Sequence, residues 1–266
     1  MNRLRKVEND AELIYMYYLL QKKEMERELN SVTMKDENGN KQRISDRVYQ
    51  FLQDYYAGTV SPVVLSDEEY DSLQNEFNRM KRTPLYHGFR TMWHAANFLW
   101  DHNKHYGSGI YGSGFYMSDS KDEALEYTEV CFEQNPNNIV EMKLLTNENF
   151  IIDYSTLKFL TEEICEGDNY KGNKHSVFLN EERKFRFDEL KDLVDKADDL
   201  EFKRTIAVDE SILAIYLGFD AVRVVTGYCK NFTILRPDKL VIKDSELKRV
   251  LSMAGGEYSD ALERME

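Results

Sequence analysis

Apolar residues in the first 80 positions recur at three- and four-residue steps, which is the spacing of an amphipathic helix. Residues 11–29 and 44–56 show this spacing. The sequence from Ser66 to Glu69 has the form of a capping box and predicts the start of a third helix. Pro84 ends this region, because proline disfavours a helical conformation in the residue before it. We therefore predict an N-terminal helical extension over residues 1–83.

Beyond Pro84 the pattern changes to short apolar or alternating runs, which are typical of strands. Helical spacing returns in an insert over residues 155–212, in which residues 179–204 are highly charged, and in a C-terminal tail over residues 246–266. Scattered strands with interspersed helices indicate an α+β domain over residues 84–245, rather than the regular alternation of a doubly wound sheet. The strand-like runs lie at 85–87, 114–118, 140–145, 149–152, 221–225, 232–235 and 240–242.

Composition narrows the function classes. The chain of 266 residues has a formal net charge of -13, which argues against a broad nucleic-acid surface because phosphate neutralisation needs clustered Lys and Arg. A local basic pocket for the two phosphates of a dinucleotide stays possible. The cysteines Cys131, Cys165 and Cys229 are too widely spaced to predict a zinc site. With neither a signal-peptide pattern nor a long apolar run, we expect a cytoplasmic protein without metal or membrane contact.

The most unusual local feature is a glycine-rich segment at residues 106–116. The unit Gly-Ser-Gly-apolar-Tyr occurs twice in tandem, ending first at Tyr111 and then at Tyr116. Glycine lets a backbone approach a ligand closely, and tyrosine offers a flat face for a nicotinamide or adenine ring. A flexible surface loop explains the composition equally well. A phosphate-binding loop is poorly supported, because no Gly-Lys-Ser/Thr follows.

Two flanking features change the balance between these readings. Upstream, a strand ends at His87 and Gly88, which places an exposed backbone N–H and C=O beside an imidazole. An amide edge of that kind can pair with a carboxamide such as the one on nicotinamide. Downstream, Ser118 or Asp119 can cap a helix that carries Tyr127.

Together these segments resemble the ADP-ribosyltransferase superfamily, in the branch whose catalytic triad is His-Tyr-Glu. This branch includes poly(ADP-ribose) polymerase-like enzymes and ADP-ribosylating domains of bacterial and phage toxins. Its first motif, a strand ending in His-Gly, is matched by residues 85–88. Its second, Gly-x-Gly-apolar-Tyr followed eleven residues later by a helical tyrosine, is matched by residues 112–116 and Tyr127. The first copy of the repeat has Asp122 at that distance, so the second copy is preferred.

The third motif departs from the family pattern. Residues 231–240 follow its outline of a strand and a proline turn, but Asn231 stands where the family has its glutamate. Asparagine can hydrogen-bond but carries no charge, and losing one such electrostatic group costs roughly 10²–10³ in rate. Asp220, Asp119 and Glu123 are the nearby acids that could replace it, although Asp119 and Glu123 also suit a helix start.

The resemblance assigns a role to each matching residue. His87 hydrogen-bonds a ribose hydroxyl, Gly88 holds the carboxamide, and two tyrosines sandwich the nicotinamide ring. Arg90 is in reach of the pyrophosphate, although a plain surface charge explains it more simply. The expected catalytic residues are His87, Tyr116 and Asn231, and the expected NAD-binding residues are Gly88, Arg90, Gly114, Tyr116 and Tyr127.

The resemblance implies a split mixed or antiparallel sheet with flanking helices, and NAD as a substrate. We expect a toxin-like mono-ADP-ribosyltransferase of bacterial or phage type, which transfers ADP-ribose to a protein or other macromolecular acceptor and releases nicotinamide. Three alternatives stay open. The protein could be an NAD glycohydrolase, a weakly catalytic module that binds NAD or ADP-ribose, or an interaction protein that acts through its N-terminal helices.

Overall fold

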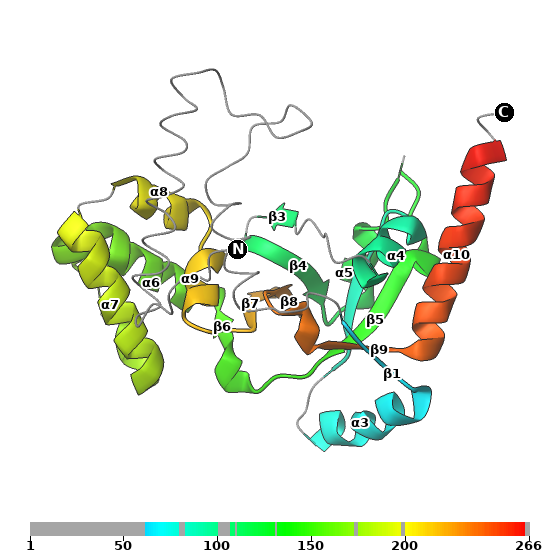
Figure 1. Cartoon of the computed structure of the whole chain (residues 1–266), viewed down its shortest axis with the longest axis horizontal. Coiled ribbons are helices and arrows are strands. Elements are labelled where there is room, and N and C mark those ends of the chain that lie inside the picture. Colours follow the sequence, from blue (N-terminus) through cyan, green and yellow to red (C-terminus); the bar gives the residue numbers. More distant parts are fainter. Residues whose placement is uncertain are drawn as a thin grey trace, which may run out of the picture. The chain divides into compact units, whose positions relative to one another are not determined.

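The computed structural model (Figure 1) describes residues 62–79, 83–100, 107–109, 111–130, 132–172, 175–197 and 200–263. They form two compact units. The sheet unit holds the described residues of 57–109, 114–151 and 220–266, and the helical unit holds those of 110–113 and 152–219. The helices predicted over 11–29 and 44–56 lie outside the described residues.

The sheet unit is built on a mixed sheet with flanking helices, which confirms the α+β class. Strand β1 pairs with β9 in parallel, whereas the pairs β9–β5, β5–β2, β2–β4, β4–β8 and β8–β7 are antiparallel. The neighbours follow the order β1-β9-β5-β2-β4-β8-β7, and β3 pairs with β4. The strands are β1 (Val63–Leu65), β2 (Leu85–Gly88), β3 (Gly107–Gly109), β4 (Gly112–Ser118), β5 (Ile139–Leu144), β7 (Ala221–Thr226), β8 (Cys229–Ile234) and β9 (Leu240–Lys243).

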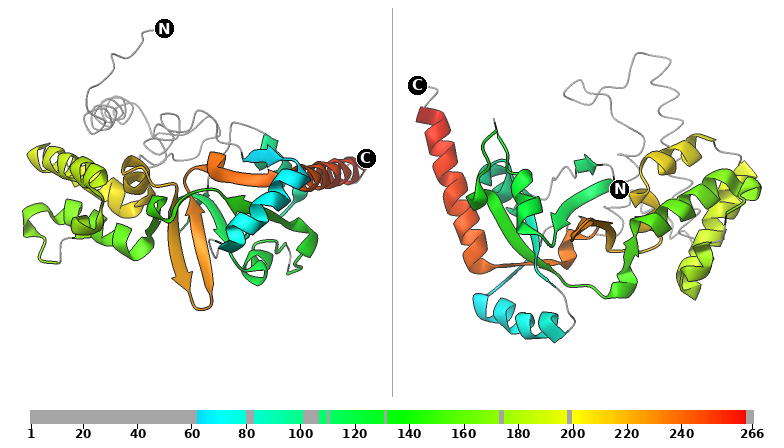
Figure 2. Two further views of the ribbon diagram at one scale, coloured as in Figure 1. Left: turned by 90° about the horizontal axis from the view of Figure 1, so that it is seen from below. Right: turned by 180° about the vertical axis from the view of Figure 1, so that it is seen from behind.

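One face of this sheet is covered by two helices, α4 (Met92–Trp100) and α10 (Asp244–Glu263), which lie side by side in Figures 1 and 2. Alternate residues of the strands point to this face, because successive side chains of a strand alternate between its two sides. The shared core contains Leu85, Phe89, Met92, Leu99, Phe115, Met117, Val140, Met142, Phe232, Ile234, Leu247 and Val250.

The opposite face carries the short helix α5 (Lys121–Glu126), which packs against β2. Three one-turn 3₁₀ helices connect elements of this unit. They are η1 (Pro136–Asn138), η2 (Glu148–Phe150) and η5 (Pro237–Lys239).

The predicted capping box is confirmed at the start of helix α3 (Asp67–Arg79). The Ser66 hydroxyl accepts from the Glu69 amide at 3.3 Å, while the Glu69 carboxylate accepts from the Ser66 amide at 2.9 Å. The structure differs in the boundary expected near residue 83, because β1 and α3 belong to the sheet unit. Val63 pairs with Val241 of β9, and a strand of only three residues is too short to reveal itself by alternation.

The helical unit includes most of β6 (Ile151–Asp153) and contains the segment expected as a charged, solvated insert. Its helices are nevertheless packed on apolar side chains of their own. Leu160, Phe187, Val194 and Ile206 are completely buried. The helices are α6 (Tyr154–Glu166), η3 (Gly167–Asn169), η4 (His175–Phe178), α7 (Glu181–Ala197), α8 (Leu200–Val208) and α9 (Ser211–Tyr216).

Candidate functional site

The three strands that carry the candidate motifs are immediate neighbours in the sheet, in the order β2-β4-β8. Tyr86 of β2 lies opposite Ser118 of β4, and Ser118 lies opposite Asn231 of β8. Tyr116, two residues before Ser118, is on the same face, since the side-chain period of a strand is two. This is the face that carries α5. The fold thus gathers segments more than 100 residues apart onto one surface.

Gly88 marks the closest approach between α5 and the sheet. A Cβ atom at this position would lie 1.9 Å from the Ala124 carbonyl oxygen and 2.9 Å from the Thr128 side chain. The sequence predicted Gly88 as a ligand-binding glycine, and the structure gives it a packing role as well. The helix can rest on β2 only because this residue has no side chain.

The peptide groups of Gly88 point towards β4. The Phe89 amide donates to the Asn138 carbonyl on the β5 side at 3.0 Å. Residues of an antiparallel strand alternate in the edge to which they bond, so the neighbouring Gly88 faces the other edge. Among the described residues, Tyr86 and Ser118 are the one pair that joins β2 to β4. The Gly88 N–H and C=O therefore face the edge at which β2 and β4 separate.

His87 lies on the other side of the strand from Gly88. Its ring packs against Phe89 and Phe115, with both centroid distances 4.3 Å. Its Nδ1 is hydrogen-bonded to the Tyr116 carbonyl, so Nδ1 carries the proton and donates, because a carbonyl can only accept. Burial lowers the pKa of His87 to about 4, although the bond to Tyr116 acts in the opposite direction. The imidazole is therefore neutral near pH 7, and its Nε2 is an acceptor.

The two tyrosines occupy different settings. Tyr116 is half-buried in β4, whereas Tyr127 ends α5 with 55% of its surface exposed. The helix is capped by Ser120, whose hydroxyl accepts from the Glu123 amide at 3.3 Å. Neither of the caps expected from the sequence, Ser118 or Asp119, fills that position.

Gly114 and Arg90 have simpler surroundings. A Cβ atom on Gly114 would lie 2.5 Å from the Thr233 methyl group and 2.9 Å from the Ile234 carbonyl oxygen. This glycine allows β8 to approach β4 closely. The Arg90 side chain is exposed, and its backbone carbonyl accepts from the Asn138 side chain at 3.0 Å.

Asn231 is the centre of a polar cluster that includes an acid. Its Nδ2 donates to Thr226 Oγ1 at 3.1 Å and to Glu123 Oε1 at 3.4 Å. The Cys229 thiol lies 4.0 Å from Asn231 Oδ1. Sequence analysis named Glu123 as one of three acids that could replace the missing glutamate, but it did not single Glu123 out. The available signal was its position one helical turn before Tyr127, which puts both side chains on the same part of α5.

The other two acids near the site have structural roles. Asp119 Oδ1 accepts from the Lys230 amide at 2.7 Å and so ties the end of β4 to β8. Asp220 is buried and hydrogen-bonded to Thr146, and burial raises the pKa of its carboxyl group. Of the three acids considered from the sequence, Glu123 is the one that contacts Asn231.

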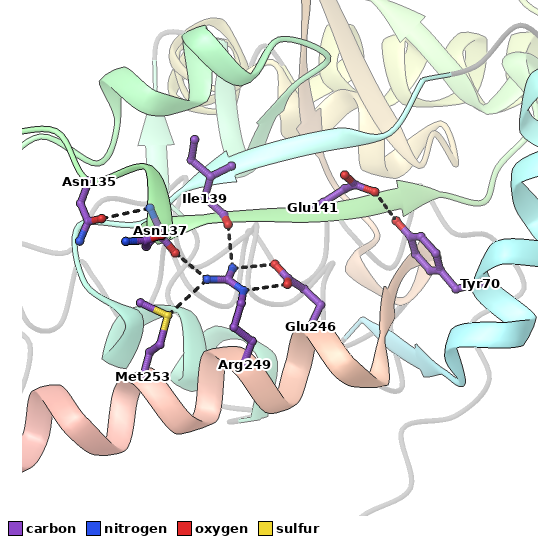
Figure 3. Close-up of polar contacts among 8 residues, drawn as sticks. All are labelled: Tyr70, Asn135, Asn137, Ile139, Glu141, Glu246, Arg249 and Met253. Atoms are coloured by element: carbon purple, nitrogen blue, oxygen red, sulfur yellow. Dashed lines mark hydrogen bonds and ion pairs between the residues drawn. The ribbon is translucent and has the colours of Figure 1, made fainter.

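A cavity of about 500 Å³ lies elsewhere in the sheet unit, between α3, β2, β5 and α10, and none of His87, Tyr116 and Asn231 lines it. Arg249 of α10 is one of the residues that line it, and Figure 3 shows the polar contacts of this side chain. This guanidinium donates to the carbonyls of Asn137 and Ile139 at 2.7 and 2.9 Å and forms a two-bonded ion pair with Glu246. These contacts attach α10 to the sheet, and this structural role accounts for the polar residues in the cavity wall.

Replacing Arg249 with alanine is expected to lower the free energy of unfolding by about 2 kcal/mol, because two backbone carbonyls and Glu246 lose a charged donor. Urea unfolding followed by circular dichroism measures the change. Lys248→Ala is the control, because that lysine pairs on the exposed side of α10 with Asp244, and little change is expected. Equal stability of the Arg249→Ala variant and the parent would show that these bonds do not anchor the helix.

Comparison of the chain with protein-family models, with characterised proteins and with solved structures gives no match. Within the described ranges, no helix has the length and apolar character needed to cross a membrane. The same residues contain no group of three or more His, Cys, Asp or Glu side chains placed to hold a metal ion. The function must therefore be argued from the site itself.

Proposed function

We propose that the protein is an ADP-ribosyltransferase that uses NAD as its substrate. The observation that carries the proposal is the adjacency of β2, β4 and β8, which brings Gly88, Tyr116 and Asn231 together from three separate motifs. Strands β2 and β4 separate beyond the Tyr86–Ser118 pair, and this separation also supports a split sheet of the ADP-ribosyltransferase type. A structural scaffold alone would not require the three motifs to occupy neighbouring strands with these residues on one face of the sheet.

NAD would be held by its nicotinamide end. The Gly88 N–H and C=O, which face the edge where β2 and β4 separate, suit the carboxamide, since they offer one donor and one acceptor. Tyr116 and Tyr127 offer flat faces for the nicotinamide ring. His87 lies on the other side of β2 from Gly88, so it would support the site indirectly: its Nδ1 donates to the Tyr116 carbonyl and ties β2 to the strand that carries Tyr116.

The reaction breaks the bond between ribose C1′ and the nicotinamide nitrogen. The bonding electron pair leaves with the nitrogen, so nicotinamide departs as a neutral molecule and positive charge develops on the ribose as in glycoside cleavage. A lone pair of the acceptor then forms the new bond to C1′, and the acceptor loses its proton to solvent. We expect transfer of a single ADP-ribose unit to a protein or other macromolecule, because Asn231 stands in place of the family glutamate.

The direct test is NAD binding and turnover by the full chain. We expect Tyr116→Ala to weaken NAD binding about ten- to hundredfold, which is the usual cost of removing an aromatic ring stacked on a base. Tyr228→Ala is the matched control, because that tyrosine is fully exposed at the turn between β7 and β8. Its NAD affinity should equal that of the parent chain, measured by titration calorimetry.

Measuring the products of NAD turnover distinguishes the transferase from a glycohydrolase and from a binding module. With NAD labelled in the adenosine part, label on macromolecules together with released nicotinamide supports the transferase. Free ADP-ribose without labelled macromolecules supports an NAD glycohydrolase, in which water is the acceptor. Tight NAD binding without nicotinamide release supports a binding module. If the parent chain does not bind NAD, the proposed function is wrong.

A further inference from the structure

We propose that Glu123 of α5 supplies the catalytic carboxylate that is missing at position 231, and that Asn231 positions it. This inference rests on the proposed function, because it concerns the same NAD site. Its starting point is the 3.4 Å hydrogen bond from Asn231 Nδ2 to Glu123 Oε1. The negative charge absent from β8 is therefore present beside it, on the adjacent helix.

The position of Glu123 is fixed by its neighbours on α5. Its backbone amide is held by the Ser120 hydroxyl at 3.3 Å. The next residue, Ala124, is buried against the bare backbone of Gly88. Helix α5 would clash with β2 if it moved closer and would lose this contact if it moved away, so the Glu123 carboxylate is held over the neighbouring strands. Its side chain is half-buried, so a substrate can still reach it.

Asn231 has the chemistry that a neighbouring carboxylate requires. Its amide group offers two N–H bonds, one to Glu123 and one to Thr226. A glutamate at position 231 would instead place two negative charges within a few ångströms, which raises the pKa of one carboxyl group and neutralises it. Asparagine at 231 and glutamate at 123 therefore form a compatible pair, with the acid moved from the strand to the helix. Asn231 acts as a positioning residue.

The Glu123 carboxylate acts by electrostatics and hydrogen bonding. It accepts a hydrogen bond from a ribose hydroxyl and faces the positive charge that develops as the C1′–nitrogen bond breaks. Glu123 gains no proton and forms no bond, so the balance of the reaction is unchanged. The charge of the side chain matters more than its size, because a neutral amide of the same shape cannot stabilise a cation equally well.

The experiment compares nicotinamide release and NAD affinity in the full chain. Glu123→Gln is expected to slow nicotinamide release roughly 10²–10³-fold, by analogy with removal of one preorganised electrostatic group, while NAD affinity changes little. Glu126→Gln is the matched control, since it removes the same charge from an exposed position of the same helix, and it should release nicotinamide at the parent rate.

Exchanging the carboxylate and the amide between positions 123 and 231 tests whether Glu123 and Asn231 act as a pair. The double variant Glu123→Gln with Asn231→Glu returns one carboxylate and one amide to the cluster in exchanged positions. It should recover at least about a tenth of the parent rate, because the field at the ribose is again that of one charge. Asn231→Glu alone should lower the rate or NAD affinity, since it pairs two carboxylates. A higher rate for this single variant would indicate a site that merely lacks its acid, and would overturn the proposal.

The results for the parent chain and for Glu123→Gln separate a wrong role for Glu123 from a wrong enzyme activity. If the parent chain releases nicotinamide and Glu123→Gln does so at the same rate, Glu123 is not the acid and the transferase proposal stands. If the parent chain binds NAD without releasing nicotinamide, both the transferase activity and the catalytic role of Glu123 are wrong. If it does not bind NAD, the site assignment fails as a whole.

Discussion

Replacing Gly88 with alanine is expected to lower the free energy of unfolding by about 3 kcal/mol or more. The added methyl carbon would lie 1.9 Å from the Ala124 carbonyl oxygen, which belongs to backbone and cannot rotate away. Overpacking a well-packed site typically costs about 1–3 kcal/mol, and a clash with backbone is at the upper end of that range or beyond it. Helix α5 must move off β2, so NAD binding should be lost together with stability. Denaturant unfolding and NAD titration of the same variant measure both effects.

Gly255→Ala is the control for Gly88→Ala. Gly255 lies in α10, and a Cβ atom there would meet no atom within 4 Å. Alanine is favoured over glycine inside a helix by about 1 kcal/mol, so this variant should be slightly more stable than the parent. A Gly88→Ala variant with parental stability and NAD affinity would show that α5 does not rest on β2 in this way.

Acidification from about pH 7 to about pH 4 is expected to lower the free energy of unfolding by about 3 kcal/mol at most through His87. Burial lowers the pKa of this residue from 6.5 to about 4 in the folded protein. Above pH 6.5 the ring is neutral in both the folded and the unfolded states, and His87 imposes no pH dependence. Below that pH the unfolded chain binds a proton that the folded chain refuses, so stability falls until the folded state titrates near pH 4.

The measurement is urea unfolding between about pH 4 and pH 8, with the His87→Gln variant as the reference. Glutamine keeps an N–H donor for the Tyr116 carbonyl but does not titrate. The variant should lose less stability on acidification than the parent, by the amount given above. The His94→Gln variant, which removes an exposed histidine of α4, is measured alongside as the control for loss of a histidine elsewhere. Equal acid sensitivity of the parent and the His87→Gln variant would contradict the prediction.

Local elements were predictable where a short-range rule governs them. The capping box at Ser66 depends on contacts within three residues, and the structure contains it as predicted. The strands β2, β4, β5, β7, β8 and β9 were all indicated by their apolar runs. Prediction of secondary structure was less accurate for elements that are held in place by residues far along the chain. Strand β1 is held by β9, which lies almost 180 residues further along the chain, and no local pattern contains that information.

The α5 cap illustrates the same limit on a smaller scale. Ser118, Asp119 and Ser120 are all plausible caps by residue type. The choice is made by β4 and β8, because Ser118 is still a strand residue opposite Asn231 and Asp119 binds the Lys230 amide. Only Ser120 is left for the helix.

The sequence by itself determined the α+β class, the preferred second copy of the glycine-rich repeat and the absence of the expected glutamate at position 231. These depend on residue identity and on spacing along one strand or helix. Tertiary structure decided that Glu123 lies beside Asn231, that Gly88 is needed for packing, and that His87 faces the core with its Nδ1 bound to the Tyr116 carbonyl. The physical reason is that strand register and helix docking set the distance between side chains far apart in sequence. The electrostatics of the site depend on those distances.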